Sequence, residues 1–236
     1  MKRPPGDRPD PRTDRRRRGR ETLTRALAPL GLRLSVRTLD RCLDYWEFLG
    51  HSRQRLNLIA RGDLEEGLLR HIGDALAGLA AGVPPGPRRL LDIGSGGGLP
   101  GIPLALARED LTVTLLEGRE KKTHWLARAL HALELHRRVS VRTGRLEEQP
   151  AEWLHGFDLL TARAVAPPRR LIAWSRRALG PESRLLVWHS AEQLPEVRQA
   201  VEEEAGDVTI KLHDTLSYTF DAISFSSNIS VLLRTH

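Results

Sequence analysis

The apolar positions between residues 21 and 82 recur at the spacing of helices. One stripe comprises Leu39, Leu43, Trp46 and Leu49, and a broader one comprises Leu64, Leu68, Leu69, Ile72, Ala75, Leu76 and Leu79. Apolar residues three and four positions apart share one face of an α-helix, so both stripes predict amphipathic helices. Asp63 is placed to cap the second helix, and the segment GVPPGP at residues 82–87 ends it. The pattern predicts an N-terminal helical extension over residues 21–82.

From residue 88 onward, short apolar runs alternate with amphipathic stretches. The runs expected to form strands are residues 88–93, 112–117, 139–143, 157–162 and 184–189, and the stretches expected to form helices are 101–109, 119–135, 167–179 and 193–205. Strands that are separated by helices form a parallel sheet with both faces covered. Residues 207–213 and 229–235 are extended with no helix between them, which predicts a hairpin at the sheet edge. We therefore expect an α/β domain with a Rossmann-like sheet over residues 83–236.

Charge is concentrated at the start of the chain. The 236 residues carry a net charge of +7, and residues 1–20 contain nine basic residues against three acidic ones, so the remainder is close to neutral. A segment rich in Arg and Pro without apolar periodicity is typical of disorder. We predict a disordered basic tail over residues 1–20. Such a tail could attract a phosphate backbone, or its arginines could reflect the composition of the genome.

Hydropathy and cysteine content limit the class of protein. The hydrophobic content of 40% is ordinary for a globular chain. No run reaches the length of about 18 apolar residues that a membrane span needs. Cys42 is the only cysteine, which excludes an intramolecular disulfide and a multi-cysteine zinc site. We expect a cytoplasmic, monomeric protein without a metal site or a membrane partner.

A glycine-rich segment directly follows the first predicted strand. Residues 90–103 read LLDIGSGGGLPGIP, with five glycines in eight positions. Glycines accept positive φ and let the backbone approach a ligand, and the helix that follows offers unpaired N–H groups. The spacing from Gly96 to Gly101 satisfies the G-x-G-x-x-G of dinucleotide enzymes. Asp92, two residues before Gly94, instead gives the D-x-G-x-G pattern of S-adenosylmethionine enzymes, which we favour over a dinucleotide and over a glycine-rich surface loop.

Ligands of parallel sheets bind beyond the carboxyl ends of the strands. At the end of the first strand the candidate cofactor-binding residues are Asp92, Gly94, Ser95, Gly96, Gly98 and Leu99. Glu117 ends the second strand and could accept hydrogen bonds from both ribose hydroxyls, or carry charge at the start of the next helix. After the third strand, Leu146 and Glu147 could bracket an adenine and its amine, or begin a solvated helix. Arg163 ends the fourth strand.

Four segments together resemble one enzyme family. LLDIGSGGGLPGIPLAL, LLEGREKKTHWL, GRLEE and TARAVA are similar to motifs of the bacterial 16S rRNA guanine-N7 methyltransferase family, RsmG, also called glucose-inhibited division protein B. The likeness runs from about residue 36 to about residue 180, and the G-L-P-G-I-P part of the glycine turn is its most specific element. It implies a class I methyltransferase fold with S-adenosylmethionine as cofactor. It also implies methyl transfer to N7 of the guanosine at position 527, in the 530 loop of 16S rRNA, with the small ribosomal subunit as partner.

The same resemblance assigns roles to residues. It implies that Gly94, Leu99, Leu146, Glu147 and Arg163 line the cofactor site, with Glu117 at the ribose. Residues 55–60, which read RLNLIA, followed by His71 and Asp74, resemble the family's N-L-T segment and H-x-x-D-S helix. Asn57 and His71 are accordingly candidate RNA contacts. His71 and Asp74 lie three residues apart on one helix face and could equally form a structural pair.

The fifth predicted strand departs from the family. Trp188 and His189 stand where members usually carry a Lys-Gly pair, and the ending SYTFDAISFSSNIS lacks the usual basic residues. Both departures fall on the side expected to face RNA. Trp188 is either a core aromatic or a stacking platform for a base taken out of its stack, which makes it a third candidate RNA contact.

The chemistry that the resemblance implies needs few groups. Guanine N7 carries a free lone pair, so no general base is required and positioning must supply the rate. An arginine fork on O6 and N7 would block the reacting atom. Arg163 is therefore expected to assist catalysis by holding the methionine carboxylate or an RNA phosphate, unless it forms a surface salt bridge. The alternatives are a methyltransferase of the same fold acting on another RNA site or a small molecule, an RNA-binding paralogue without activity, and a nicotinamide oxidoreductase.

Overall fold

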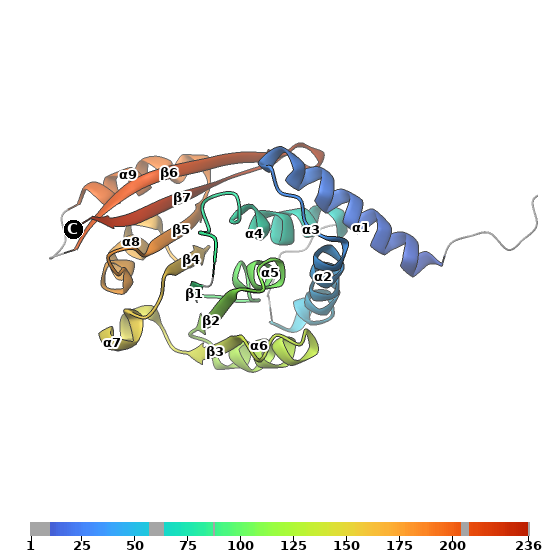
Figure 1. The fold of residues 1–236 in the computed structure, drawn as a ribbon, viewed down its shortest axis with the longest axis horizontal. Coiled ribbons are helices and arrows are strands. Elements are labelled where there is room, and N and C mark those ends of the chain that lie inside the picture. Colours follow the sequence, from blue (N-terminus) through green and yellow to red (C-terminus); the bar gives the residue numbers. More distant parts are fainter. Residues whose placement is uncertain (1–9, 57–63, 87, 204–207, 236) are drawn as a thin grey trace, which may run out of the picture.

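The computed structural model describes residues 10–56, 64–86, 88–203 and 208–235, which form a seven-stranded sheet with helices on both faces (Figure 1). The strands are β1 (Arg88–Ile93), β2 (Leu111–Glu117), β3 (Val139–Thr143), β4 (Leu159–Arg163), β5 (Arg184–His189), β6 (Thr209–Phe220) and β7 (Phe225–Thr235). Their order is β3-β2-β1-β4-β5-β7-β6, with β1 to β5 parallel and β7 antiparallel to β5 and β6. The strand order reverses between β1 and β4, which is the point where such sheets bind ligands.

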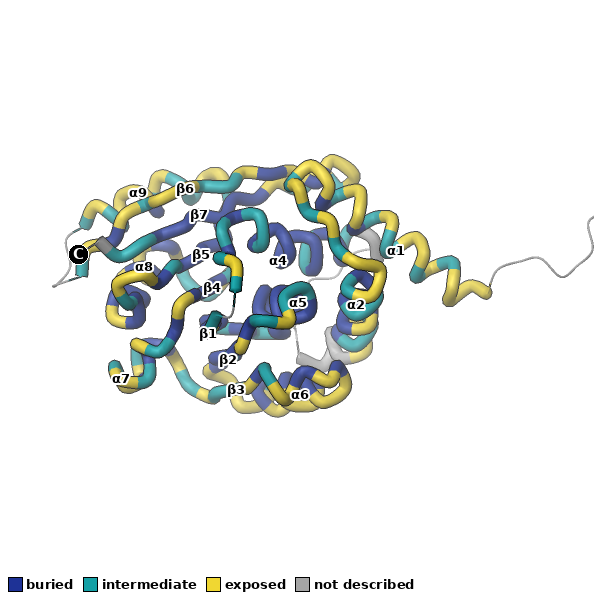
Figure 2. The backbone as a smooth tube through the Cα atoms, in the orientation of Figure 1, coloured by how far each residue is buried: buried dark blue, intermediate teal, exposed yellow. Residues whose placement is uncertain are grey.

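Each face of the sheet packs against its own group of helices. The helices that follow the strands are α5 (Gly101–Ala107), α6 (Glu120–Ala132), α7 (Ala151–Leu154), α8 (Pro168–Ser175) and α9 (Leu194–Glu202), with short 3-10 turns at Ala28–Leu30, Leu146–Glu148, Arg176–Ala178, Ala191–Gln193 and Asp221–Ile223. Leu90 belongs to the core shared with α5 and α6, whereas Leu91 belongs to the core shared with α8 and α9. Side chains alternate along a strand, so both faces of β1 are buried (Figure 2).

The N-terminal extension covers the face that carries α5 and α6. It consists of α1 (Pro11–Leu27), α2 (Val36–Leu56), α3 (Leu64–Leu68), a π-helical turn (Leu69–Gly73) and α4 (Asp74–Ala77). The stripe of α2 residues Leu39, Leu43, Trp46 and Leu49 is buried in the same core as the sheet. None of the helices in the described ranges is long and apolar enough to cross a bilayer. The predicted cap Asp63 and the candidate RNA contact Asn57 lie outside the described residues.

The prediction of a disordered tail is wrong for residues 11–20, which form the first half of α1. Within the helix, Arg17 pairs with Asp14 at 2.6 Å and with Glu21 at 2.7 Å. Arg16 and Arg20 reach across to carboxylates of α2, with an Arg20–Asp40 distance of 2.8 Å. Because α2 supplies the missing negative charge, the basic run folds onto the protein. Residues 1–9 lie outside the described residues.

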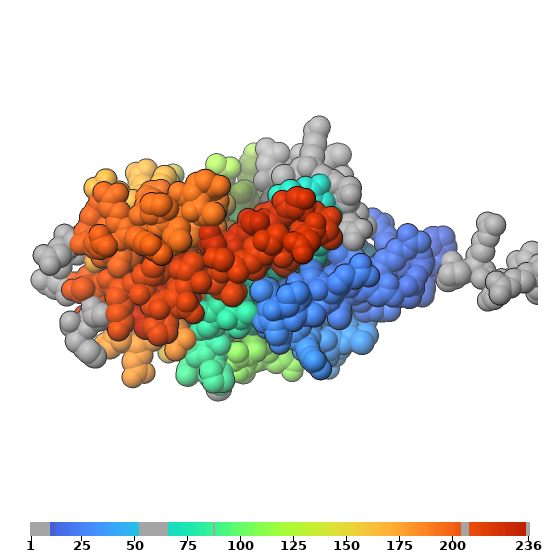
Figure 3. Space-filling view, turned by 90° about the horizontal axis from the view of Figure 1, so that it is seen from above, coloured from blue at the N-terminus to red at the C-terminus, as the bar shows by residue number. Residues whose placement is uncertain are grey.

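The predicted terminal hairpin is present and is longer than its apolar runs suggested. Strand β6 continues to Phe220 and β7 begins at Phe225. In the added part, Tyr218 and Phe220 are buried while Thr219 between them is exposed, the alternation of a strand with one covered face. The hairpin crosses the surface seen in Figure 3 and ends beside the N-terminal extension, where Phe220 packs close to Gly73.

Candidate cofactor and substrate site

The glycine turn connects β1 to α5 through backbone that glycine adopts without strain. Gly94, Gly96 and Gly98 have φ angles of 63°, 56° and 90°, in the left-handed region that a Cβ atom disfavours. A Cβ atom on Gly94 would also lie 2.8 Å from Cγ2 of Val165. The turn is closed by a 2.6 Å hydrogen bond from the Gly98 N–H to the Ser95 carbonyl. Bare backbone is therefore presented beyond the carboxyl end of β1.

Asp92 lies beneath this turn and is fully buried. One carboxylate oxygen accepts a hydrogen bond from the Thr161 hydroxyl at 2.8 Å, and the other accepts one from the Gly101 N–H at 3.2 Å. Burial raises the pKa of this carboxyl to about 6, despite the hydrogen bonds from Thr161 and Gly101. The expectation that Asp92 touches the cofactor is thus corrected, because its carboxylate ties β1 to β4 and to the start of α5.

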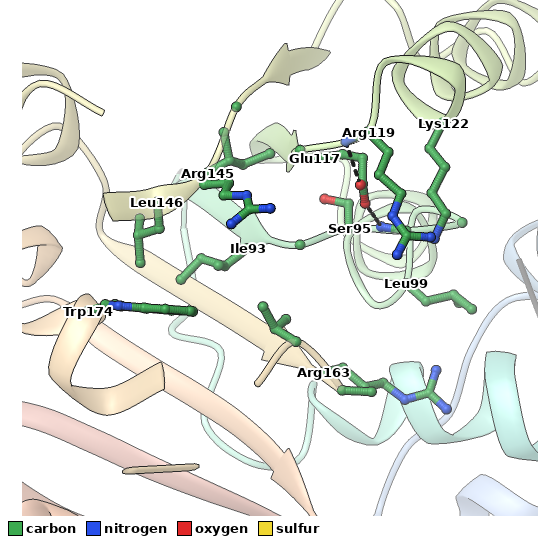
Figure 4. A pocket seen from close by; sticks show the side chains of 18 of the residues that line it. Ile93, Ser95, Leu99, Glu117, Arg119, Lys122, Arg145, Leu146, Arg163 and Trp174 are labelled. Atoms are coloured by element: carbon green, nitrogen blue, oxygen red, sulfur yellow. Dashed lines mark hydrogen bonds between the residues drawn. The ribbon is translucent and has the colours of Figure 1, made fainter. Parts of the chain in front are cut away.

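Glu117 ends β2 and holds the glycine turn from the opposite side. Its two carboxylate oxygens accept hydrogen bonds from the N–H groups of Gly96 and Arg119, both at 2.9 Å (Figure 4). Each carboxylate oxygen has two lone-pair sites, so each retains one for a further donor. A pair of neighbouring hydroxyl groups, such as those of a ribose, fits this arrangement.

The glycine turn and Glu117 line a cavity of about 670 Å³ at the carboxyl ends of the parallel strands (Figure 4). A volume of this size suits a small-molecule or cofactor site. The predicted residues that line it are His71, Gly94, Ser95, Gly96, Leu99, Glu117, Leu146, Glu147 and Arg163. Asp92 and Gly98 are not among the lining residues and support the turn from below.

An apolar slot forms one end of the cavity. Leu146 and Trp174 approach it from opposite sides, and Ile93 lies between them at its floor (Figure 4). Leu146 is buried, and the Trp174 ring lies beneath the guanidinium of Arg170 at 4.8 Å. Such a slot suits a planar base. The sequence placed Leu146 here, whereas Trp174 sits within a helical stretch and carried no motif that would single it out.

Three basic side chains that line the cavity were also not predicted from the sequence. Arg119 and Lys122 come from the start of α6, and Arg145 follows β3 (Figure 4). Arg119 and Arg145 each come two residues after a strand end, which is the signal that could have found them, whereas Lys122 lies in the first turn of α6. Their charges favour a ligand or substrate that is negatively charged.

The N-terminal extension also touches the glycine turn. Tyr45 of α2 is fully buried, and its hydroxyl donates a hydrogen bond to the Gly97 carbonyl. Burial raises the pKa of this hydroxyl, which therefore stays protonated as a donor. The extension thus helps to set the position of the turn. Local sequence patterns could not predict this contact, because its two segments are distant in the chain.

Arg163 ends β4 and turns its guanidinium toward the extension (Figure 4). Its Nε lies 2.7 Å from a carboxylate oxygen of Asp74, and its Nη2 donates to the Arg70 carbonyl at 2.6 Å. Asp74 is 1% exposed, and its other oxygen accepts a 2.5 Å hydrogen bond from the Tyr218 hydroxyl. The expectation of a surface salt bridge is corrected, whereas the expectation that Arg163 lines the cavity is met. The ion pair is buried and joins the sheet to the extension.

Trp188 is a core residue, so the alternative of a stacking platform for RNA is wrong. The residue is 6% exposed, and its indole N–H donates to the Asp74 carbonyl at 2.9 Å. His189 is buried too, between the Ser190 carbonyl and the Ser230 hydroxyl, both at 2.8 Å. Burial lowers the pKa of His189. The end of β5 is covered by the N-terminal extension, through Asp74 and Gly78, and by Ser230 of β7.

His71 lies on the π-turn and lines the cavity. Its ring stacks on Trp46 with centroids 6.0 Å apart, and its Nδ1 atom is buried without a hydrogen-bond partner among the described residues. Burial and the charges of Arg163 and Arg70 lower the pKa of this imidazole to about 4. The structural pair of His71 with Asp74, one of the two alternatives from the sequence, does not form, because the two carboxylate oxygens of Asp74 bind Arg163 and Tyr218 instead.

The lining groups suit the binding of a nucleoside-like cofactor. They provide backbone at the turn, a carboxylate with free lone pairs, an apolar slot and basic side chains. Among the described residues, no group of three or more His, Cys, Asp or Glu side chains is arranged to hold a metal ion.

Comparison with solved structures identifies the fold. Mitomycin 7-O-methyltransferase MmcR has a TM-score of 0.58 at 19% identity, covering 92% of this chain and 68% of that one. A putative tRNA (m1A22) methyltransferase of Streptococcus pneumoniae has a TM-score of 0.52 at 16% identity, with 67% and 69% covered. The [4+2]-cyclase SpnF has a TM-score of 0.53 at 17% identity, with 75% and 84% covered. The fold is that of the class I methyltransferases, and since one neighbour is a cyclase, the fold alone does not define the reaction.

Sequence comparison defines the family. The model of the rRNA small subunit methyltransferase G family matches residues 38–216, so the chain belongs to this family and the resemblance found in its motifs is confirmed. The ribosomal RNA small subunit methyltransferase G of Neisseria meningitidis is 36% identical over 156 residues, which are 66% of this chain and 72% of that protein. The protein of the same name from Caldanaerobacter subterraneus is 32% identical over 157 residues, 66% of this chain and 65% of its own length. That of Sorangium cellulosum is 40% identical over 152 residues, 61% of each chain.

Proposed function

We propose that this chain is an S-adenosylmethionine-dependent rRNA methyltransferase that methylates N7 of the guanosine at position 527, in the 530 loop of 16S rRNA. The observation that carries the proposal is the family match over residues 38–216. That range contains every residue that lines the cavity. The substrate would be the small ribosomal subunit, and the chain would act on it as a monomer.

The cavity offers a place for each part of the cofactor. Glu117 would accept hydrogen bonds from the ribose hydroxyls with the lone pairs that Gly96 and Arg119 leave free. Leu146 and Trp174 would enclose the adenine, with Glu147 at its amine. The backbone of the glycine turn would lie against the methionine part. When bound there, S-adenosylmethionine supplies an electrophilic methyl group on a sulfonium sulfur.

For methyl transfer, this chain would have to orient the cofactor and the guanine and keep other groups from binding N7. Guanine N7 needs no general base, so no residue has to remove a proton. The Arg163 guanidinium is engaged by Asp74 and by the Arg70 carbonyl, which keeps its fork away from the reacting nitrogen. Arg163 would then act by holding the π-turn against the end of β4, as a positioning residue.

The experiment that tests this proposal maps N7-methylguanosine in 16S rRNA. Borohydride and aniline cleave the RNA at that modification, so cells with and without the gene are compared. We expect cleavage at position 527 that disappears when the gene is deleted and returns with the gene on a plasmid. Unchanged cleavage in the deletion strain would refute the assigned target. Calorimetry with S-adenosylhomocysteine and with NAD separates this proposal from a nicotinamide oxidoreductase, since only the former should bind.

A further inference from the structure

The base that accepts the methyl group must meet the cavity away from the adenine slot. Leu146 and Trp174 form that slot, and Arg163 lies toward the opposite end (Figure 4). The guanidinium of Arg163 binds the carbonyl of Arg70 at 2.6 Å. The next residue, His71, lines the cavity. His71 therefore lies at the Arg163 end of the cavity, away from the adenine slot.

The π-turn that carries His71 is held in place by buried contacts. Asp74 follows the turn directly, and its carboxylate is shared between Arg163 at 2.7 Å and the Tyr218 hydroxyl at 2.5 Å. The ring of Phe225, from the C-terminal hairpin, lies 5.1 Å beneath the guanidinium of Arg70. Single π-turns within helices occur frequently at functional sites. This one is clamped by both the sheet and the hairpin, so the position of His71 is fixed.

The imidazole of His71 is neutral at physiological pH. Burial and two neighbouring arginines hold its pKa near 4. Its Nδ1 atom is buried without a partner among the described residues. A buried N–H group without a partner is rarer in proteins than an unpaired lone pair, which favours the tautomer that carries its proton on Nε2. His71 then has one N–H donor and no positive charge.

Methylation of guanine N7 asks for a donor of this kind. Guanine presents O6 beside N7 as a second acceptor, whereas adenine presents an amine donor at the same place. A single N–H directed at O6 would select guanine and leave N7 free, which an arginine fork would not. A neutral donor also avoids placing a positive charge beside a base that becomes positive during the reaction.

We propose that His71 determines base specificity, with its Nε2–H donating a hydrogen bond to O6 of the methyl-accepting guanine. The N7–carbon bond forms as the carbon–sulfur bond breaks, the electron pair of the broken bond stays on sulfur, and His71 neither gains nor loses a proton. This inference rests on the proposed function, because it requires a guanine as the acceptor.

The test uses small subunits reconstituted from 16S rRNA that carries guanine, inosine or 2-aminopurine at the target position. Inosine keeps O6 and N7, whereas 2-aminopurine keeps N7 and lacks O6. We expect His71→Ala to lower the single-turnover rate on guanine and inosine by about tenfold to a hundredfold. Wild type should lose a similar factor on 2-aminopurine, where His71→Ala should cause no further loss. His71→Gln, which retains an N–H donor, should recover part of the rate.

Two controls keep the outcomes apart. His155→Ala changes an exposed histidine outside the cavity lining and should leave all three rates unchanged. Affinity for S-adenosylhomocysteine, measured by calorimetry, should be the same in His71→Ala and wild type. An equal loss of rate in His71→Ala on guanine and on 2-aminopurine subunits would overturn the inference. Equal wild-type rates on guanine and 2-aminopurine subunits would overturn it as well, and that comparison requires no variant. Failure of wild type to label guanine subunits would instead refute the proposed function.

Discussion

Tyr218 donates a 2.5 Å hydrogen bond to the carboxylate of Asp74 across 144 positions of the chain. The other oxygen of the same carboxylate pairs with Arg163, which lines the cavity. Burial raises the pKa of the Tyr218 hydroxyl, with the nearby Asp74 charge as the second cause, so the hydroxyl remains a donor. The C-terminal hairpin, the N-terminal extension and the cavity are thereby joined through one buried group.

Variants of Asp74 and of Tyr218 should show how much each interaction of this carboxylate contributes to stability. Asp74→Asn would leave the charge of Arg163 without a partner, and we expect it to lower the free energy of unfolding by about 3–5 kcal/mol. Tyr218→Phe removes one hydrogen bond to a charged group and should cost about 1.5–3 kcal/mol. Glu21→Ala removes an ion pair with Arg17 whose side chains are 51% and 53% exposed, so it should leave the stability almost unchanged. Urea unfolding followed by circular dichroism measures all three, and equal effects would contradict the buried network.

Glu117 should control cofactor affinity through its two oxygens. We expect Glu117→Ala to weaken binding of S-adenosylhomocysteine by about 1–3 kcal/mol, the range of charge-assisted hydrogen bonds. Glu117→Gln should weaken binding of S-adenosylhomocysteine nearly as much. The glutamine amide has one oxygen and one NH₂ group, so it can accept from either Gly96 or Arg119 but cannot use a separate acceptor atom for each. Glu120→Ala, at an exposed position on α6, is the matched control. Calorimetry that finds unchanged affinity in a folded Glu117→Ala protein would remove this residue from the site.

Two alanine substitutions in the glycine turn differ in whether the added Cβ atom meets a neighbouring side chain. Gly94 and Gly96 both have positive φ, so alanine at either position should cost about 1–2 kcal/mol of backbone strain. An added Cβ meets Val165 at 2.8 Å in the first case and no atom closer than 3.8 Å in the second. Gly94→Ala should therefore destabilise the fold more than Gly96→Ala, and Val165→Ala should relieve the difference in a double mutant. Equal destabilisation, without rescue, would show that this contact carries no strain.

The buried carboxyl of Asp92 predicts a pH dependence of stability. Its pKa is raised from 3.8 to about 6 in the folded protein, so folding favours the protonated form. The resulting stabilisation is present below pH 3.8 and is lost as the pH rises through about 6, with a total of about 3 kcal/mol. Asp92→Asn should remove this slope. The measurement is the difference in unfolding free energy between wild type and Asp92→Asn at several pH values, and a constant difference would contradict the buried carboxyl.

Local patterns in the sequence were sufficient where structure follows from neighbouring residues. The strands at residues 88–93, 139–143 and 184–189 have the predicted bounds, because each short run of strand-forming residues ends at a polar or glycine-containing turn. The same local information placed Glu117 and Leu146 at the cavity, since Glu117 ends one parallel strand and Leu146 follows another, and the carboxyl ends of both strands face the cavity.

Contacts between distant segments were beyond such patterns. Trp188 could be read as an RNA platform because nothing near it in the chain reveals the Asp74 carbonyl that binds its indole. The arginines of α1 suggested disorder, because the partners of Arg16 and Arg20 on α2, Asp44 and Asp40, are distant in the sequence. In both cases the tertiary structure supplies a partner that the neighbouring sequence does not reveal.

The most direct test of the central claim is transfer of a labelled methyl group by the purified protein. Labelled S-adenosylmethionine is supplied with small ribosomal subunits that lack the modification, and the labelled rRNA is then cleaved with borohydride and aniline. We predict label in 16S rRNA with cleavage at position 527. A protein that binds S-adenosylhomocysteine in calorimetry and yet labels no ribosomal RNA would contradict the account.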